Sequence, residues 1–262
     1  MGAVSFSIDP GLLEVLAQNL QLDLFVETGT FEGASVDCAK NYFSEIYSVE
    51  LSPEYYQNAR DKFLPQSHIN IVQGDGATAL KALRPVFNGR SIVFWLDAHW
   101  CVASNTAGEH SQCHLADEIE AIGALNDDSI VLIDDARFFL APPPYPHVFD
   151  QWPDLSAIIR KLQALSDRHE FRVINDVILF FPVRLSEAIN DYGYRHGVDW
   201  LSIYQKSTAL DVCEADRAAR LVVINDLSGR LMEWEDKYRA SFSLHFKIKR
   251  LGRAVKNIFI KS

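Results

Sequence analysis

The chain has 262 residues, of which 48% are hydrophobic, so it can bury a sizeable core as one large α/β domain or two small ones. Its formal net charge of -10 argues against nucleic-acid binding by the body of the protein. We expect no leader segment, and no apolar run is long enough to span a bilayer. The four cysteines are scattered, which predicts reduced thiols in a cytoplasmic protein: Cys38, Cys101, Cys113 and Cys213.

Apolar runs of strand length alternate with segments of helical spacing along most of the chain. A first helix is expected over 9–21, because Asp9 can cap it and Pro10 suits its first turn. Strands are expected at 22–27, 45–50, 69–73, 91–97, 129–134, 171–174 and 177–181. Further helices are expected at 33–42, 53–63, 77–83, 115–125 and 154–166. This order predicts an α/β fold with a Rossmann-like, doubly wound, seven-stranded sheet, mostly parallel, that closes on an antiparallel strand.

The last third of the chain differs from the rest. We expect a core domain over 1–182 and a largely helical C-terminal extension over 183–262, although 183–213 is hard to interpret. A helix over 214–238 is predicted by an apolar stripe at spacings of three and four: Leu221, Ile224, Leu227, Leu231, Trp234 and Tyr238. After Asp236 there are eight basic residues and no acid, whereas 1–236 has a net charge of -18. This basic, amphipathic end predicts a peripheral membrane contact or a homo-oligomer contact, or else a helix that packs on the acidic body.

The first strand leads into a loop with two glycines, Gly29 and Gly33. In the dinucleotide fingerprint a glycine lets the backbone approach a pyrophosphate, but Phe31 stands at that place here. A cofactor without phosphates fits better, and S-adenosylmethionine is such a molecule. Glu27 could then accept from its ammonium group, and the backbone of Gly29 could lie close to its carboxyalkyl arm, with Thr28 and Gly33 as further candidate cofactor-binding residues. The alternative is that both glycines only make a tight turn and a helix contact.

Acids also end the next two strands. Glu50 is placed to bind both ribose hydroxyls of the cofactor, and Asp75, with Gly76 beside it, to bind the adenine amino group. Alternatively, both acids are solvated strand ends.

Three aspartates follow the fourth and fifth strands: Asp97, Asp134 and Asp135. Carboxylates that converge repel one another unless they are protonated or neutralised by a cation, and oxygen ligands suit Mg²⁺. A bound Mg²⁺ would lower the pKa of a substrate hydroxyl. The alternative is that Asp134 caps the strand, Asp135 pairs with Arg137 and Asp97 binds a backbone amide.

His99 follows Asp97 closely and is a candidate general base, although it could instead position substrate or simply pack. A competing zinc site would draw its ligands from one stretch of the chain: His99, Cys101, Glu109, His110, Cys113 and His114. Their spacing matches no common zinc pattern. The segment 102–111 is more readily interpreted as a lid over the site.

These residues resemble class I S-adenosylmethionine-dependent methyltransferases over about 22–182. The run from Glu27 to Gly33 is similar to their first motif, and Glu50 and Asp75 stand where their ribose and adenine acids stand. The segments 95–99 and 133–137 resemble metal-dependent sugar O-methyltransferases related to macrocin O-methyltransferase. That resemblance implies three aspartates on Mg²⁺ and a chelating sugar. The short segment before the first strand and the tail after Pro182 depart from that family.

The leading hypothesis is therefore O-methylation of a sugar hydroxyl in glycan or glycosylated natural-product biosynthesis. A catechol-like acceptor is an alternative, favoured by aromatic residues near the expected site: Trp100, Phe138, Phe139 and Tyr145. A third hypothesis is a non-catalytic, cofactor-binding scaffold, and a nicotinamide oxidoreductase is the least favoured. The proline-rich segment 142–146 either shapes an acceptor pocket or spaces the next helix.

Overall fold

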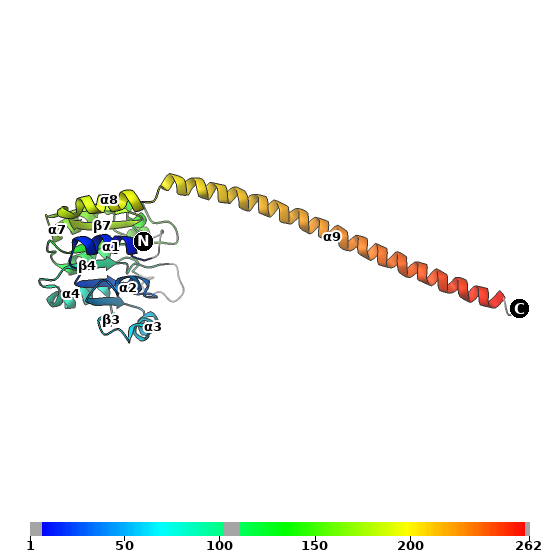
Figure 1. Cartoon of the computed structure of the whole chain (residues 1–262), viewed down its shortest axis with the longest axis horizontal. Coiled ribbons are helices and arrows are strands. Elements are labelled where there is room, and N and C mark those ends of the chain that lie inside the picture. Colours follow the sequence, from blue (N-terminus) through cyan, green and yellow to red (C-terminus); the bar gives the residue numbers. More distant parts are fainter. Residues whose placement is uncertain (1–6, 102–110, 260–262) are drawn as a thin grey trace. The chain divides into compact units, whose positions relative to one another are not determined.

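The computed structural model describes residues 7–101 and 111–259, and it divides into two compact units, Met1–Val198 and Asp199–Ser262. The first unit is built on one seven-stranded sheet in the order β3-β2-β1-β4-β5-β7-β6 (Figure 1). Its strands are β1 (Leu24–Thr28), β2 (Glu45–Glu50), β3 (Ile69–Gln73), β4 (Ile92–Leu96), β5 (Ile130–Ile133), β6 (His169–Ile174) and β7 (Val177–Pro182). The first five strands run parallel, whereas β7 pairs antiparallel with both β5 and β6. The predicted fold class is thus confirmed.

Helices cover both faces of the sheet. They are α1 (Pro10–Asn19), α2 (Ala34–Ala39), α3 (Pro53–Phe63), α4 (Gly76–Phe87), α5 (Leu115–Ile122), α6 (Arg137–Leu140), α7 (Leu155–Leu165) and α8 (Ser186–His196). One core cluster joins the sheet to α1, α2, α3 and α8, and the other joins it to α4, α5 and α7. Strands β1, β4, β5 and β7 are buried along their whole length, as expected for a sheet that is covered on both faces.

The first unit extends beyond the predicted boundary at Pro182 and ends at Val198. Ile189 and Tyr192 of α8 are buried in the core cluster that contains α1. The Tyr192 hydroxyl donates to Asp9, whose other oxygen caps α1 by accepting from the Gly11 amide at 2.9 Å. Residues 183–198 therefore help to close the first unit, because they cover apolar surface of α1 and the sheet.

The second unit is one helix, α9 (Trp200–Phe259), of 60 residues. The sequence predicts a helix only over 214–238, with a candidate amphipathic continuation, so the helix begins 14 residues earlier than expected. The side chains that the structure describes in α9 are nearly all exposed. Among the described residues, no helix is both long and apolar enough to cross a membrane.

Candidate active site

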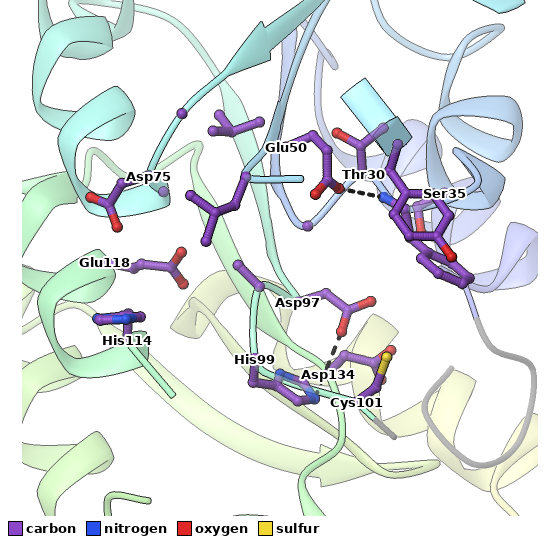
Figure 2. Close-up of a pocket in the computed structure, with 18 of the residues that line it drawn as sticks. Thr30, Ser35, Glu50, Asp75, Asp97, His99, Cys101, His114, Glu118 and Asp134 are labelled. Atoms are coloured by element: carbon purple, nitrogen blue, oxygen red, sulfur yellow. Dashed lines mark hydrogen bonds and ion pairs between the residues drawn. The ribbon is translucent and has the colours of Figure 1, made fainter. Parts of the chain in front are cut away.

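The carboxyl ends of β1 to β5 meet at one cavity of about 360 Å³ (Figure 2). Most of the predicted site residues line it: Gly29, Glu50, Asp75, Gly76, Asp97, His99, Asp134 and Asp135. Three predicted cofactor residues, Glu27, Thr28 and Gly33, do not line it. A parallel sheet offers its ligand site at this edge, so segments that are far apart in the chain contribute to one cavity.

The fold itself requires a glycine at position 29. Its φ is +87°, and a Cβ at this position would lie 2.4 Å from the backbone oxygen of Asp97. The loop after β1 therefore runs directly against the end of β4. This close approach fixes the distance between the loop after β1 and Asp97.

Replacing Gly29 with alanine should destabilise the protein more than replacing Gly89 with alanine. Both glycines have positive φ, so both substitutions carry backbone strain of about 1–2 kcal/mol, but a Cβ at Gly89 meets nothing within 4 Å. Urea denaturation of the two variants isolates the cost of the contact with Asp97. Equal losses of stability would contradict the close approach.

Gly33 serves packing, which agrees with the alternative stated for it. It precedes α2 with a φ of +74°, and a Cβ there would lie 2.6 Å from the Phe63 ring. Between the two glycines, Phe31 has a φ of 48° and donates its amide to Glu50 Oε2 at 2.8 Å. The other oxygen of Glu50 accepts from the Ser52 amide at 2.7 Å. Glu50 thus ties the loop to the end of β2 while its carboxylate lines the cavity.

Glu27 lies beneath the cavity. It is 1% exposed, and Ser48 on β2 donates to it through its hydroxyl while also contacting the Thr30 hydroxyl at 2.6 Å. Burial raises the pKa of Glu27 to about 8, although hydrogen bonds from Ser48 and Ser35 act the other way. Ser35 lines the cavity and also hydrogen-bonds to Glu27, so the Ser35 side chain lies between Glu27 and the cavity. Thr28 is likewise buried in β1.

The opposite end of the cavity contains Asp75 and an acid that sequence reasoning missed, Glu118 (Figure 2). Asp75 caps α4 by accepting from the Thr78 amide at 2.8 Å. Glu118 is 2% exposed, and burial raises its pKa to about 7. A Cβ on Gly76 would lie 2.0 Å from Glu118 Oε1, so this glycine makes room for the carboxyl group.

The sequence contains a signal that could have identified Glu118. With Leu115, Ile119 and Ile122 it forms the spacing of three and four that marks the buried face of α5. Burying a carboxyl group costs free energy because the group loses its hydration. An acid on the buried face of a helix is therefore a candidate functional residue.

His99 links the aspartates at the ends of β4 and β5. Its Nε2 lies 2.8 Å from Asp135 Oδ2 and 3.8 Å from Asp97 Oδ1. The other oxygen of Asp135 accepts from Arg137, which also pairs with Asp176. Asp134 accepts from the Asp135 amide at 2.8 Å. The cluster is therefore neutralised in part by His99 and Arg137.

These contacts shift the pKa values of the cluster in different directions. Burial raises the pKa of Asp97 well above its ordinary value, and burial with the charge of Asp135 raises that of Asp134 to about 6. Burial alone would lower the pKa of His99, but the hydrogen bond to Asp135 and the charge of Asp97 raise it to about 9. His99 and Arg137 outweigh burial at Asp135 and lower its pKa.

The turn between β6 and β7 forms hydrogen bonds with the residues that follow Asp135. The Asp176 backbone oxygen accepts from the Ala136 amide at 2.7 Å, and its side chain accepts from the Arg137 amide at 2.7 Å. Asn175 and Asp176 have φ values of 52° and 67°, as a two-residue hairpin turn with two left-handed positions requires. The hairpin thus holds Arg137, which in turn binds Asp135.

The three aspartates do not fit the predicted Mg²⁺ site in this arrangement. Both oxygens of Asp135 already bind His99 and Arg137, and one oxygen of Asp134 binds a backbone amide. Over residues 7–101 and 111–259, no three His, Cys, Asp or Glu side chains are grouped to hold a metal ion. This includes the described members of the zinc hypothesis; Glu109 and His110, like nearly all of the predicted lid, lie outside the described residues.

Aromatic side chains surround His99. Its ring lies edge-on to Phe138, Phe139 and Trp152, with centroids 5.5 to 6.3 Å apart. Of the four aromatic residues singled out from the sequence, Phe139 is buried in the core and Tyr145 is 96% exposed. None of the four lines the cavity.

No protein-family profile matches the chain, and no curated protein matches it. Among solved structures, an O-methyltransferase from Bacillus cereus in complex with SAH is similar at 11% identity and a TM-score of 0.44, covering 66% of this chain and 80% of that chain. An rRNA methylase from Streptococcus thermophilus has 11% identity and a TM-score of 0.39, with 65% and 93% covered. Spermidine synthase from Thermotoga maritima has 12% identity and a TM-score of 0.40, with 65% and 56% covered. Likeness at this level does not assign a reaction, so function has to be judged from the site itself.

Proposed function

We propose that the protein is an S-adenosylmethionine-dependent O-methyltransferase. The observation that carries this proposal is that Glu50, Asp75 and Asp97, which lie at the ends of β2, β3 and β4, all line one cavity. A row of carboxylates suits a cofactor that presents hydroxyl, amino and sulfonium groups. It would repel the phosphates of a dinucleotide, because like charges that lie close together are destabilising.

In this proposal, each part of the cofactor occupies its own part of the cavity. The amino-acid end would lie at Gly29 and Ser35 above Glu27, and the ribose at Glu50. The adenine would lie at the end formed by Asp75 and Glu118. The methyl group would then point toward Asp97, beside His99.

The chain's own residues account for the transfer step. Bound S-adenosylmethionine would supply an electrophilic methyl group, whose transfer to the acceptor oxygen would release a neutral thioether. Asp97 would accept the hydrogen bond of the acceptor hydroxyl and take its proton as the oxygen is methylated. His99 is held by Asp135 through Nε2, so it positions Asp97 and balances its charge rather than acting as the base.

We further propose a sugar hydroxyl as the acceptor. Phe31 and Tyr55 both line the cavity, with ring centroids 4.5 Å apart, and Phe31 is 39% exposed. The apolar face of a sugar ring could lie on these rings while its hydroxyls reach Asp97 and Asp134. The same aromatic pair would accept a catechol-like ring, which is the second candidate.

Calorimetry of S-adenosylmethionine binding, followed by turnover with sugar and catechol acceptors, tests the proposal. We expect binding of the cofactor and methyl transfer to at least one sugar. Transfer to catechols alone would replace the acceptor and keep the reaction. Cofactor binding without any turnover would favour the scaffold hypothesis, and absence of binding would exclude a methyltransferase.

A chelator should leave the rate of methyl transfer unchanged, because Asp135 is already neutralised by His99 and Arg137. The measurement is turnover with a chelator present, compared with turnover after adding back Mg²⁺. A rate that falls and is restored by Mg²⁺ would instead support the three-aspartate site that the sequence predicts.

A further inference from the structure

The helix α9 presents apolar side chains that nothing in the described part of the chain covers. Ile203, Leu210, Ile224, Leu227 and Trp234 are between 44% and 61% exposed. Most of the stability of a protein helix comes from packing of its apolar face, and a helix without such packing is marginal in water. An unsupported helix of 60 residues therefore calls for a partner.

The spacing of these residues indicates which kind of partner. They belong to one seam that alternates steps of three and four along the described side chains: Ile203, Lys206, Leu210, Cys213, Arg217, Arg220, Ile224, Leu227, Leu231, Trp234 and Tyr238. A repeat of seven residues keeps a seam facing another helix in a coiled coil. The partner expected from the spacing is thus a second long helix.

We propose that α9 pairs antiparallel with α9 of a second copy of this chain, with Leu227 opposite the partner's Leu231. Parallel pairing in register would place Lys206, Arg217 and Arg220 each against itself inside the seam, where unpaired like charges are costly. The antiparallel pairing avoids this. It is also centred on residue 229, the middle of a helix that spans 200–259, so the two helices overlap along their whole length.

This alignment sets apolar positions against apolar ones. Ile224 faces the partner's Trp234, and Arg220 faces the partner's Tyr238, a suitable pair for a cation–π contact. By the same count, Ile203 and Leu210 face positions 255 and 248, where the sequence has valine and isoleucine. Where the seam is polar, Cys213 and Arg217 face positions 245 and 241, which are histidine and serine.

Charge outside the seam favours the same orientation. Residues 239–259 contain six basic residues and no acid. In the antiparallel pair they face residues 199–219, which contain four acids and two basic residues. In a parallel pair the two basic segments would face each other. Oppositely charged segments therefore meet only in the antiparallel arrangement.

The mass of the full chain in solution, measured by light scattering after gel filtration, tests the pairing. We expect twice the 29.6 kDa of one chain. Leu231→Glu should reduce the mass to that of one chain, whereas Met232→Glu, at the neighbouring exposed position outside the seam, should keep the double mass. A wild-type chain of single mass, or equal effects of the two substitutions, would overturn the proposal.

Cysteine cross-linking tests the orientation, because Cys213 is exposed and lies in the seam. Under mild oxidation we expect no link between two Cys213 side chains in the wild type. In the variant His245→Cys we expect a link from residue 213 to residue 245 of the other copy, identified by peptide mapping. A link between two Cys213 side chains would show parallel pairing and refute the antiparallel one.

An anionic lipid surface is the competing occupant of this helix. Sedimentation of the full chain with vesicles that contain phosphatidylserine, at the ionic strength of the mass measurement, distinguishes the two. A chain of single mass that sediments with these vesicles would mean that α9 lies on membranes and that the pairing does not occur. A double mass with no sedimentation supports the pairing.

Discussion

Replacing Asp97 with asparagine should slow methyl transfer by about 10²–10⁴-fold, an effect much larger than its effect on the binding of S-adenosylmethionine. The amide keeps the shape of the carboxyl group but cannot take the acceptor proton. The other contacts expected for the cofactor, at Gly29, Glu50 and Asp75, stay intact. The measurement pairs single-turnover kinetics with cofactor titration by calorimetry.

The matched control for this variant is Asp117→Asn. Asp117 is exposed on α5 and does not line the cavity, so its replacement should change neither the rate nor the affinity. If Asp97→Asn transfers methyl groups as fast as the wild type, the assignment of the proton to Asp97 is wrong. His99 would then have to be examined as the base, after release from Asp135.

Replacing Glu27 with glutamine should make the protein more stable at pH 8 and its cofactor binding weaker. A buried acid whose pKa is raised from 4.5 to about 8 is held neutral in the folded state. As pH rises above the unfolded value, the unfolded chain ionises first, and stability on the order of 4 kcal/mol is lost by pH 8. Glutamine removes this loss, so the difference from the wild type should be large at pH 8 and small at pH 4.5.

The same carboxyl group should make cofactor binding depend on pH. If the ammonium group of S-adenosylmethionine needs ionised Glu27, affinity should increase with pH up to about 8, and binding should release a proton. Urea denaturation at the two pH values and calorimetry in buffers of different ionisation heat measure both effects. Glu14→Gln, an exposed change on α1, is the control. Unchanged affinity in Glu27→Gln would remove Glu27 from the cofactor site.

The fold follows from the sequence because its signals are local. Each buried strand is a short apolar run, and α1, α4 and α7 each begin after an aspartate that caps them: Asp9, Asp75 and Asp154. The boundaries show where local signals fail. The helix α4 continues to Phe87, beyond the predicted end at 83, although Pro85 lies inside it. In α8, only contacts with α1 and the sheet explain why Ile189 and Tyr192 are buried.

The sequence predicts which strand ends meet at the site. It does not predict which carboxylate oxygen binds which side chain. Gly29, Glu50, Asp75 and Asp97 lie at or just after the ends of strands, and a parallel sheet brings such positions together. Asp135 differs because its two partners come from other places: His99 follows β4, and Arg137 is itself held by Asp176 on the last hairpin. Sequence spacing does not show that His99 and Arg137 each bind one oxygen of Asp135, so the sequence is compatible with both the metal site and its alternative.

The dependence of Arg137 on Asp176 also bears on the order in which the protein is made. A nascent chain that ends before the hairpin turn already contains Asp97, His99, Asp134 and Asp135, but lacks the carboxylate that holds Arg137. Its sheet also lacks the antiparallel strand that covers the edge of β5. The pairing of Arg137 with Asp176 and the addition of the antiparallel strand to the sheet therefore both become possible only after the hairpin has left the ribosome. Until then, the emerging chain has the parts of the cavity without the support that sets their charges.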